Sequence, residues 1–142
     1  MRITNRTRNT LLGTRVEQAS TWWGRLRGYI GRPEPKRGEG ILLVRCNAVH
    51  TWWMSFSLDL IFLDERGKVL ELKRLVSPWK HTRRVPKARY VLEVPVGTID
   101  TSGTQVGDEL TWRDPASYTI SILSPQSGEE ASTSTTSRSR NG

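Results

Sequence analysis

Residues 58–63, with the sequence LDLIFL, restrict the possible folds more than any other stretch of this chain. Successive side chains of a strand point to opposite faces, and here both faces are mostly apolar. Such a strand is typical of a sheet that is covered on both sides. Asp59 then occupies a place where an acidic side chain is rarely found. The polar loop 64–67 (DERG) separates this strand from a second candidate strand at 68–72 (KVLEL), which predicts a β-hairpin.

The remaining elements are predicted from short apolar runs and from turn residues. Further strands are expected at 10–19 with a break at a glycine, at 41–44, at 90–94, at 109–113 and at 118–123. Ser20 is the expected N-cap of a short helix within 21–32, because apolar side chains recur there every three or four residues. Strands that follow one another through turns predict a mainly β fold: a single compact antiparallel β-sandwich or barrel of six to seven short strands with one short N-terminal helix.

Length and composition predict the domain organisation. A chain of 142 residues forms one domain, and we expect residues 1–123 to make it. Residues 124–142 are rich in Ser and Thr and contain no large apolar side chain, so we expect a disordered tail that folding does not require. The single Cys excludes an internal disulfide, and no apolar run is long enough for a signal peptide or a transmembrane helix. We therefore expect a cytoplasmic protein; its oligomeric state has no signature in the sequence.

Basic and aromatic residues suggest one class of partner. Part of the net charge of +8 lies in residues 73–89, which contain no acidic side chain. The candidate basic patch in this run consists of Lys73, Arg74, Lys80, Arg83 and Arg84. Such a patch can attract nucleic acid, and the Trp pairs at 22–23 and 52–53, with Trp79, could stack on bases. Because no nucleic-acid-binding motif accompanies the charge, a solvated basic face and Trp side chains in the core are the favoured interpretation.

Cys46, His50 and Met54 follow one another at intervals of four residues. That spacing places them on one side of a helix or of a strand. A thiolate, an imidazole and a thioether together would suit a soft metal such as Cu(I), whereas each could also fill the core. No second His or Cys lies nearby in the sequence to complete a ligand set. We therefore predict neither a metal nor a cofactor, and we expect Cys46 to be a buried structural thiol.

The same residues allow a catalytic interpretation. Cys46 and His50 could form a nucleophile and its base, with Asp59 orienting the imidazole, although a separation of four residues rarely gives that geometry. For Asp59 the favoured hypothesis is an ionised carboxylate that accepts hydrogen bonds and anchors loop 51–57. The alternative for Asp59 is an acid or base with a raised pKa.

Several short blocks of the sequence, taken in order, resemble one known family. They are RGYIGR at 27–32, GILL at 40–43, CN at 46–47, HTWWM at 50–54, LDLIFLD at 58–64, GKV at 67–69, VLEVPVGT at 91–98 and GDEL at 107–110. In these blocks the chain is similar to domain-of-unknown-function family 192, also called uncharacterised protein family 0127, and to its subgroup with a His-Thr-x-x-Met motif. Ser55, Phe56 and Ser57 stand where the commoner form has x-Asn-Thr. The resemblance implies a compact, mostly β domain and no established activity.

Three functions follow as hypotheses. The leading one is a non-catalytic binding or accessory module that presents loop region 46–59 to an unknown protein or small molecule. Its candidate functional surface consists of Cys46, His50, Thr51, Trp53, Met54 and Asp59. The alternative is an enzyme or soft-metal protein that uses Cys46, His50 and Asp59. The third is a nucleic-acid binder that acts through the basic loops.

Overall fold

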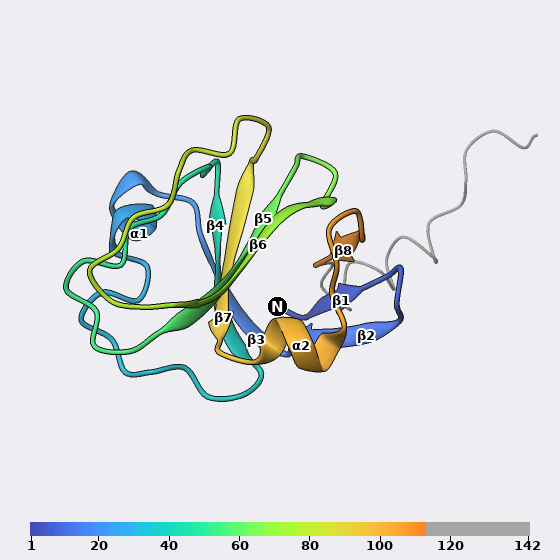
Figure 1. The fold of residues 1–142 in the computed structure, drawn as a ribbon, viewed down its shortest axis with the longest axis horizontal. Helices are drawn as coiled ribbons and strands as arrows, with labels where there is room; N and C mark the ends of the chain where they lie inside the picture. The colour runs from blue at the N-terminus through green and yellow to red at the C-terminus, as the bar shows by residue number, and fades with distance from the viewer. Residues whose placement is uncertain (113–142) are drawn as a thin grey trace, which may run out of the picture.

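The structure, a computed structural model, describes residues 1–112 apart from the side chains of Trp22, Trp23 and Leu26. This part of the chain is mainly β, with two sheets and two short helices (Figure 1). The strands are β1 (Ile3–Asn5), β2 (Thr10–Gly13), β3 (Arg15–Ala19), β4 (Glu39–Val44), β5 (Leu58–Leu63), β6 (Val69–Val76), β7 (Tyr90–Pro95) and β8 (Leu110–Thr111), and the helices are α1 (Trp22–Arg27) and α2 (Thr98–Ser102). Neither of these helices is long and apolar enough to cross a membrane.

The larger sheet has five strands in the order β3-β4-β7-β5-β6, and the smaller has three in the order β2-β1-β8. Only β3 and β4 pair in parallel, whereas the other named pairs are antiparallel. Figure 1 shows the smaller sheet at one end of the molecule, α1 at the other end, and α2 beside the smaller sheet. The predicted mainly β class is confirmed. Within residues 1–112 the strands form two sheets rather than one closed barrel.

The β5–β6 hairpin lies where the sequence predicts it. β5 pairs antiparallel with β6 on one side and with β7 on the other, so it is a central strand. The turn between β5 and β6 is closed by Asp64, whose amide donates to the carbonyl of Lys68 and whose carboxylate accepts from the Lys68 amide. Gly67 in this turn has a φ of 85°, which side chains other than glycine rarely adopt.

The N-terminal region differs from the prediction. The strand expected at 10–19 is two strands, β2 and β3, which belong to different sheets. The chain turns between them because the amides of Thr14 and Arg15 both donate to the carbonyl of Gly38, at 2.9 Å each. With the short strand β1 this makes eight strands in the described part, against the six to seven expected for the whole domain. The strand expected at 118–123 lies outside the described residues.

The two helices also correct the prediction. The N-cap of α1 is Thr21 rather than Ser20, because the Thr21 hydroxyl accepts the Gly24 amide at 3.0 Å. The helix ends at Gly28, earlier than expected. Helix α2 is not among the elements predicted from the sequence, and Gly97 and Gly103, both left-handed, cap this short helix.

Apolar side chains cover both faces of the five-stranded sheet. All six residues of β5 are buried, as the sequence predicts for a strand covered on both sides. The face toward the smaller sheet packs Leu42, Ile61, Leu63, Leu92 and Val94 against Ile3, Leu12, Ile99 and Leu110. The opposite face packs Ile41, Leu43, Leu58, Leu60, Phe62 and Val91 against Tyr29, Val49 and Met54. The smaller sheet and α2 therefore cover one face, and the loops around Tyr29 and Met54 cover the other.

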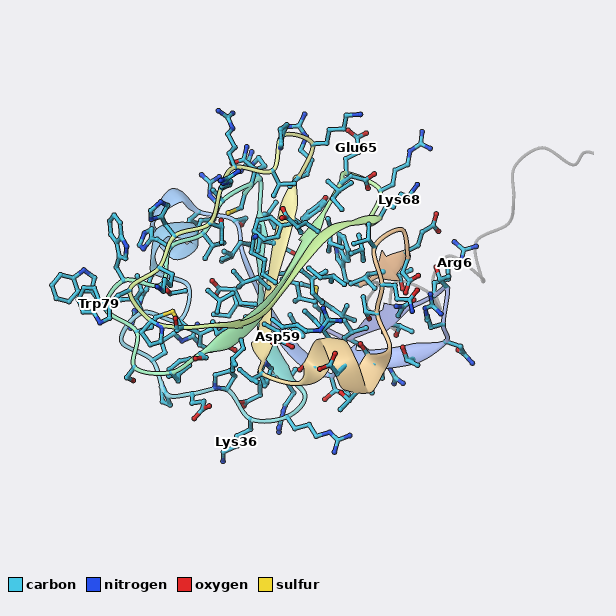
Figure 2. The ribbon with its side chains drawn as sticks, viewed as in Figure 1. Arg6, Lys36, Asp59, Glu65, Lys68 and Trp79 are labelled. Atoms are coloured by element: carbon cyan, nitrogen blue, oxygen red, sulfur yellow. The ribbon has the colours of Figure 1, made fainter. Side chains whose placement is uncertain are left out.

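Asp59 is 1% exposed and accepts three backbone hydrogen bonds. Its Oδ1 accepts the amide of Leu75 at 3.0 Å, and its Oδ2 accepts the amides of Gly97 and Ile99 at 3.1 Å each. Figure 2 places Asp59 near the centre of the molecule. The prediction that Asp59 accepts hydrogen bonds is confirmed, but the predicted anchoring of loop 51–57 is wrong.

Asp59 does not anchor loop 51–57 because successive side chains of β5 point to opposite faces of the sheet. Asp59 points to the same face as Ile61, where α2 packs, whereas Met54 packs on the opposite face. Asp59 therefore ties the start of α2 and the end of β6 to the central strand. Leu75 has a φ of 52°, and its hydrogen bond to Asp59 helps to hold this unfavourable backbone conformation.

We predict that Asp59→Asn lowers the free energy of unfolding by about 1 to 3 kcal/mol, because an amide NH₂ group cannot accept hydrogen bonds from the backbone. The loss is measured by urea unfolding at neutral pH. Asp100→Asn is the matched control, since Asp100 is an exposed carboxylate paired with Arg74 and should change stability by less than about 0.5 kcal/mol. Equal stability of Asp59→Asn and the native protein would contradict this role.

Candidate functional site

Two irregular segments, 46–51 and 80–89, run side by side in opposite directions. Four backbone hydrogen bonds join them, each from the amide of one residue to the carbonyl of another: Cys46 to Arg89 (3.1 Å), Val85 to Asn47 (2.9 Å), Thr82 to Val49 (2.8 Å) and Thr51 to Lys80 (2.8 Å). His50 and His81 face each other as an isolated antiparallel bridge. The candidate loop and the basic run, which are separate in the sequence, therefore form one paired unit.

Thr51 holds this unit together. It is buried, and its hydroxyl donates to the carbonyl of Ser77 at 2.7 Å and accepts the amide of Lys80 at 2.9 Å. Its carbonyl also accepts the amide of Trp79 at 3.0 Å. The structure thus places Thr51 beneath the candidate surface rather than on it.

A pocket of about 250 Å³ lies between this unit and the end of α1. Its walls are formed by Arg25, Arg27, Gly28, Tyr29, Leu43, Cys46, Ala48, Val49, His50, Met54 and Glu93. Cys46, His50 and Met54 therefore all line this pocket, although they lie on a loop and not on the helix or strand that their spacing suggested. The volume is just below the range of typical ligand pockets, so any ligand must be small.

Glu93, which the sequence analysis did not single out, is the most unusual residue of this pocket. It lies in β7, is 2% exposed, and its Oε2 has no hydrogen-bond partner among the described residues. Burial raises the pKa of Glu93 to about 8, although Arg32 opposes this rise. At neutral pH the side chain is therefore mostly a neutral carboxylic acid. The sequence does contain a feature that could have indicated Glu93: an acidic residue within the apolar strand YVLEV, which is the same feature that singled out Asp59.

Gly28 makes room for the Glu93 carboxyl group. A Cβ atom at Gly28 would lie 2.9 and 3.1 Å from the two carboxyl oxygens of Glu93. Gly28 also has a φ of 46°, which disfavours a side chain there. Gly28 therefore both ends α1 and leaves space in the pocket for the carboxyl group of Glu93.

The Cys46 thiol and the Tyr29 hydroxyl, which also line the pocket, are held in their neutral forms. Burial raises the pKa of the Cys46 thiol, which donates to the carbonyl of Ala48 at 3.2 Å. Burial, and then the nearby Glu93, raise the pKa of Tyr29, so that its hydroxyl stays protonated. Cys46 is half-buried on the pocket wall instead of fully buried as expected. A thiol with a raised pKa is a poor nucleophile near neutral pH, which agrees with the prediction of a structural Cys46.

His50 adds a second unsatisfied polar atom. Its Nδ1 is buried and has no hydrogen-bond partner among the described residues. Its ring packs against the ring of Trp52, with the centroids 4.9 Å apart. Buried polar groups are nearly always paired, so the unsatisfied atoms on His50 and Glu93 point to partners that the described residues do not supply.

Asp59 does not belong to this pocket. It points to the opposite face of the sheet, and its oxygens are occupied by Leu75, Gly97 and Ile99. The arrangement of Cys46, His50 and Asp59 that the catalytic interpretation requires is therefore not assembled. In the part of the chain that the structure describes, no three His, Cys, Asp or Glu side chains are grouped so that they could hold a metal.

The Trp side chains near the basic run are exposed, so their predicted place in the core is wrong. Trp53 is 70% exposed and Trp79 is 58% exposed, and their rings meet edge to face with centroids 4.9 Å apart. Figure 2 shows Trp79 projecting from one end of the molecule. Both residues have positive φ angles, 71° and 64°, a backbone conformation that bulky side chains rarely adopt.

The candidate basic patch divides into two parts. Lys73 pairs with Glu71 at 3.2 Å, and Arg74 pairs with Asp100 at 2.8 Å, so their charges are partly balanced. Lys80, Arg83 and Arg84 are exposed and form no ion pair within residues 1–112. Unbalanced positive charge is therefore found on the segment that also carries Trp79.

We predict that Glu93→Gln removes a pH dependence from the stability of the protein. Because the folded pKa lies above the unfolded one, Glu93 favours folding fully below about pH 4.5, and this contribution is lost as the pH rises toward about 8. The stability of Glu93→Gln relative to the native protein should therefore increase across this range, by on the order of 5 kcal/mol in total. Urea unfolding at several pH values measures this difference in the free energy of unfolding. Glu65→Gln, at an exposed position, is the control. A constant difference between the Glu93→Gln and native curves would refute the prediction.

Comparisons with known proteins agree with the fold and with the resemblance in the sequence. Residues 3–112 match the family DUF192, described as Uncharacterized ACR. A UPF0127 protein of Thermococcus sibiricus is 37% identical over 78% of this chain and 73% of its own length, and one of Pyrococcus abyssi is 30% identical over 78% and 96%. The crystal structure of a protein of unknown function from Novosphingobium aromaticivorans has the same fold, with a TM-score of 0.68 at 21% identity over 78% of this chain and 82% of that one. The chain therefore belongs to the DUF192 family, whose curated relatives carry the name UPF0127.

Proposed function

We propose that this protein is a binding module that takes a small ligand bearing an amino group into the pocket between α1 and loop 46–54. The observation that carries the proposal is Glu93, a buried carboxyl group that lines a pocket and whose Oε2 has no hydrogen-bond partner among the described residues. Isolated buried carboxyl groups are unfavourable, and a cation beside Glu93 would satisfy the oxygen and stabilise its ionised form.

The rest of the pocket restricts the ligand further. Leu43, Val49 and Met54 provide apolar walls, whereas Arg25 and Arg27 provide positive charge. An amino group at Glu93, a short apolar body and an anionic end near the arginines would match this distribution. Small zwitterionic amino compounds are therefore the proposed ligand class. Because Cys46 and Tyr29 are held neutral, the pocket favours binding over nucleophilic chemistry.

Calorimetry with three groups of small compounds tests the proposal: amino acids, simple amines and simple carboxylic acids. Amino acids should bind most tightly, and binding at pH 7 should release close to one proton, because the ligand lowers the raised pKa of Glu93. Proton release is obtained from the heat measured in two buffers of different ionisation enthalpy. Glu93→Gln should abolish both amino-acid binding and proton release, whereas Glu65→Gln should change neither quantity. Binding of carboxylic acids alone, or binding without proton release, would contradict the proposal.

A second candidate is a surface for single-stranded nucleic acid, favoured by the exposed pair Trp53 and Trp79 beside Lys80. Aromatic rings can stack on bases while basic side chains contact phosphates. Each stacked base contributes about 1 to 3 kcal/mol, so Trp79→Asn should weaken binding of a labelled oligonucleotide by roughly tenfold or more. Asn is chosen because it tolerates the positive φ of this position. Arg83→Gln with Arg84→Gln should reduce the salt dependence of binding. No binding at low salt would exclude this candidate.

Two further features stay predictions from the sequence: a cytoplasmic location, and a single domain within residues 1–123 with a tail that folding does not require.

A further inference from the structure

The two histidines of the chain, His50 and His81, face each other across an antiparallel bridge. Two backbone hydrogen bonds of 2.8 Å flank the bridge, from the Thr51 amide to the Lys80 carbonyl and from the Thr82 amide to the Val49 carbonyl. Neither histidine exchanges backbone hydrogen bonds with the other, which makes them a non-hydrogen-bonded pair. In such pairs the Cα atoms lie only about 4.5 Å apart, and the two side chains stand on the same face.

Both imidazoles also line one surface hollow of about 390 Å³. Trp52 and Thr82 contribute to its walls, and the packing of Trp52 on the His50 ring restricts rotation of that ring. The Nδ1 atom of His50 is buried without a hydrogen-bond partner among the described residues. His81 is exposed, so its ring can turn toward an ion in the hollow.

We propose that His50 and His81 bind a divalent transition-metal ion such as Ni²⁺, Cu²⁺ or Zn²⁺ between their imidazole rings. Neutral imidazole nitrogens suit these ions, and two of them at neighbouring positions act as a chelate, with water filling the remaining coordination positions. Sequence reasoning missed this site, because it sought a second ligand near His50 in the sequence, whereas pairing with the basic run supplies His81.

The surrounding charge predicts how the site responds to salt. Lys80 and Arg83 lie within two residues of His81 and repel a cation. Salt screens this repulsion, so the affinity should rise with ionic strength. A site formed by carboxylates would show the opposite dependence.

Titration calorimetry of the full-length protein with Ni²⁺ tests the proposal. We expect one Ni²⁺ per chain, and we expect His81→Asn and His50→Asn each to weaken binding by at least about tenfold, because each removes one arm of the chelate. His81→Asn is the cleaner variant, since His81 is exposed and does not line the pocket of Glu93. His81→Cys retains a ligating side chain and should retain Zn²⁺ binding.

Two controls separate this site from the proposed ligand pocket. Cys46→Ser and Glu93→Gln alter that pocket and should leave Ni²⁺ binding unchanged. Circular dichroism and thermal unfolding verify that each variant is folded. Absence of Ni²⁺ binding by the native protein, or unchanged binding by folded His81→Asn, would overturn the proposal. Loss of binding in Cys46→Ser but not in His81→Asn would also overturn it, since the ion would then lie in the other pocket.

Discussion

The five-stranded sheet is covered by apolar side chains on both faces, and it nevertheless contains two buried acidic side chains, one on each face. The rest of the structure depends on how these two carboxyl groups are accommodated. Asp59 receives three backbone amides and so can be buried as part of the framework. Glu93 receives none at Oε2 within the described chain, and burial raises its pKa to about 8. Asp59 therefore stabilises the fold, whereas the carboxyl group of Glu93 lines a pocket and is available to a ligand.

The second determinant is the pairing of two loops that are separate in the sequence. Backbone hydrogen bonds between 46–51 and 80–89 place the pocket, the histidine pair and the exposed Trp residues on one part of the molecule. Thr51 fixes this arrangement with hydrogen bonds on both its hydroxyl and its backbone. The positive φ angles of Trp53 and Trp79 show that the backbone there adopts unfavourable conformations, which are often found at functional sites.

The central part of the fold could be predicted from the sequence, because it depends on local patterns. The alternation in LDLIFL and the turn at 64–67 determine the hairpin, and Asp59 is recognisable as an acid in an apolar strand. The partners of Asp59 could not be predicted, since they depend on which face of the sheet α2 covers. Glu93 carries the same local signal as Asp59, but only its distance from other polar groups in the fold distinguishes the two. The contact between His50 and His81 likewise arises from tertiary pairing, which no spacing in the sequence indicates.

Glu93 is a neutral acid at neutral pH because the fold buries it and no described residue hydrogen-bonds to its Oε2. A ¹³C NMR titration that follows its side-chain carboxyl carbon tests this most directly. The structure predicts a titration midpoint near pH 8. A midpoint near the ordinary glutamate value, about 4.3, would contradict the claim, because the carboxyl group would then be ionised and stabilised in the folded protein.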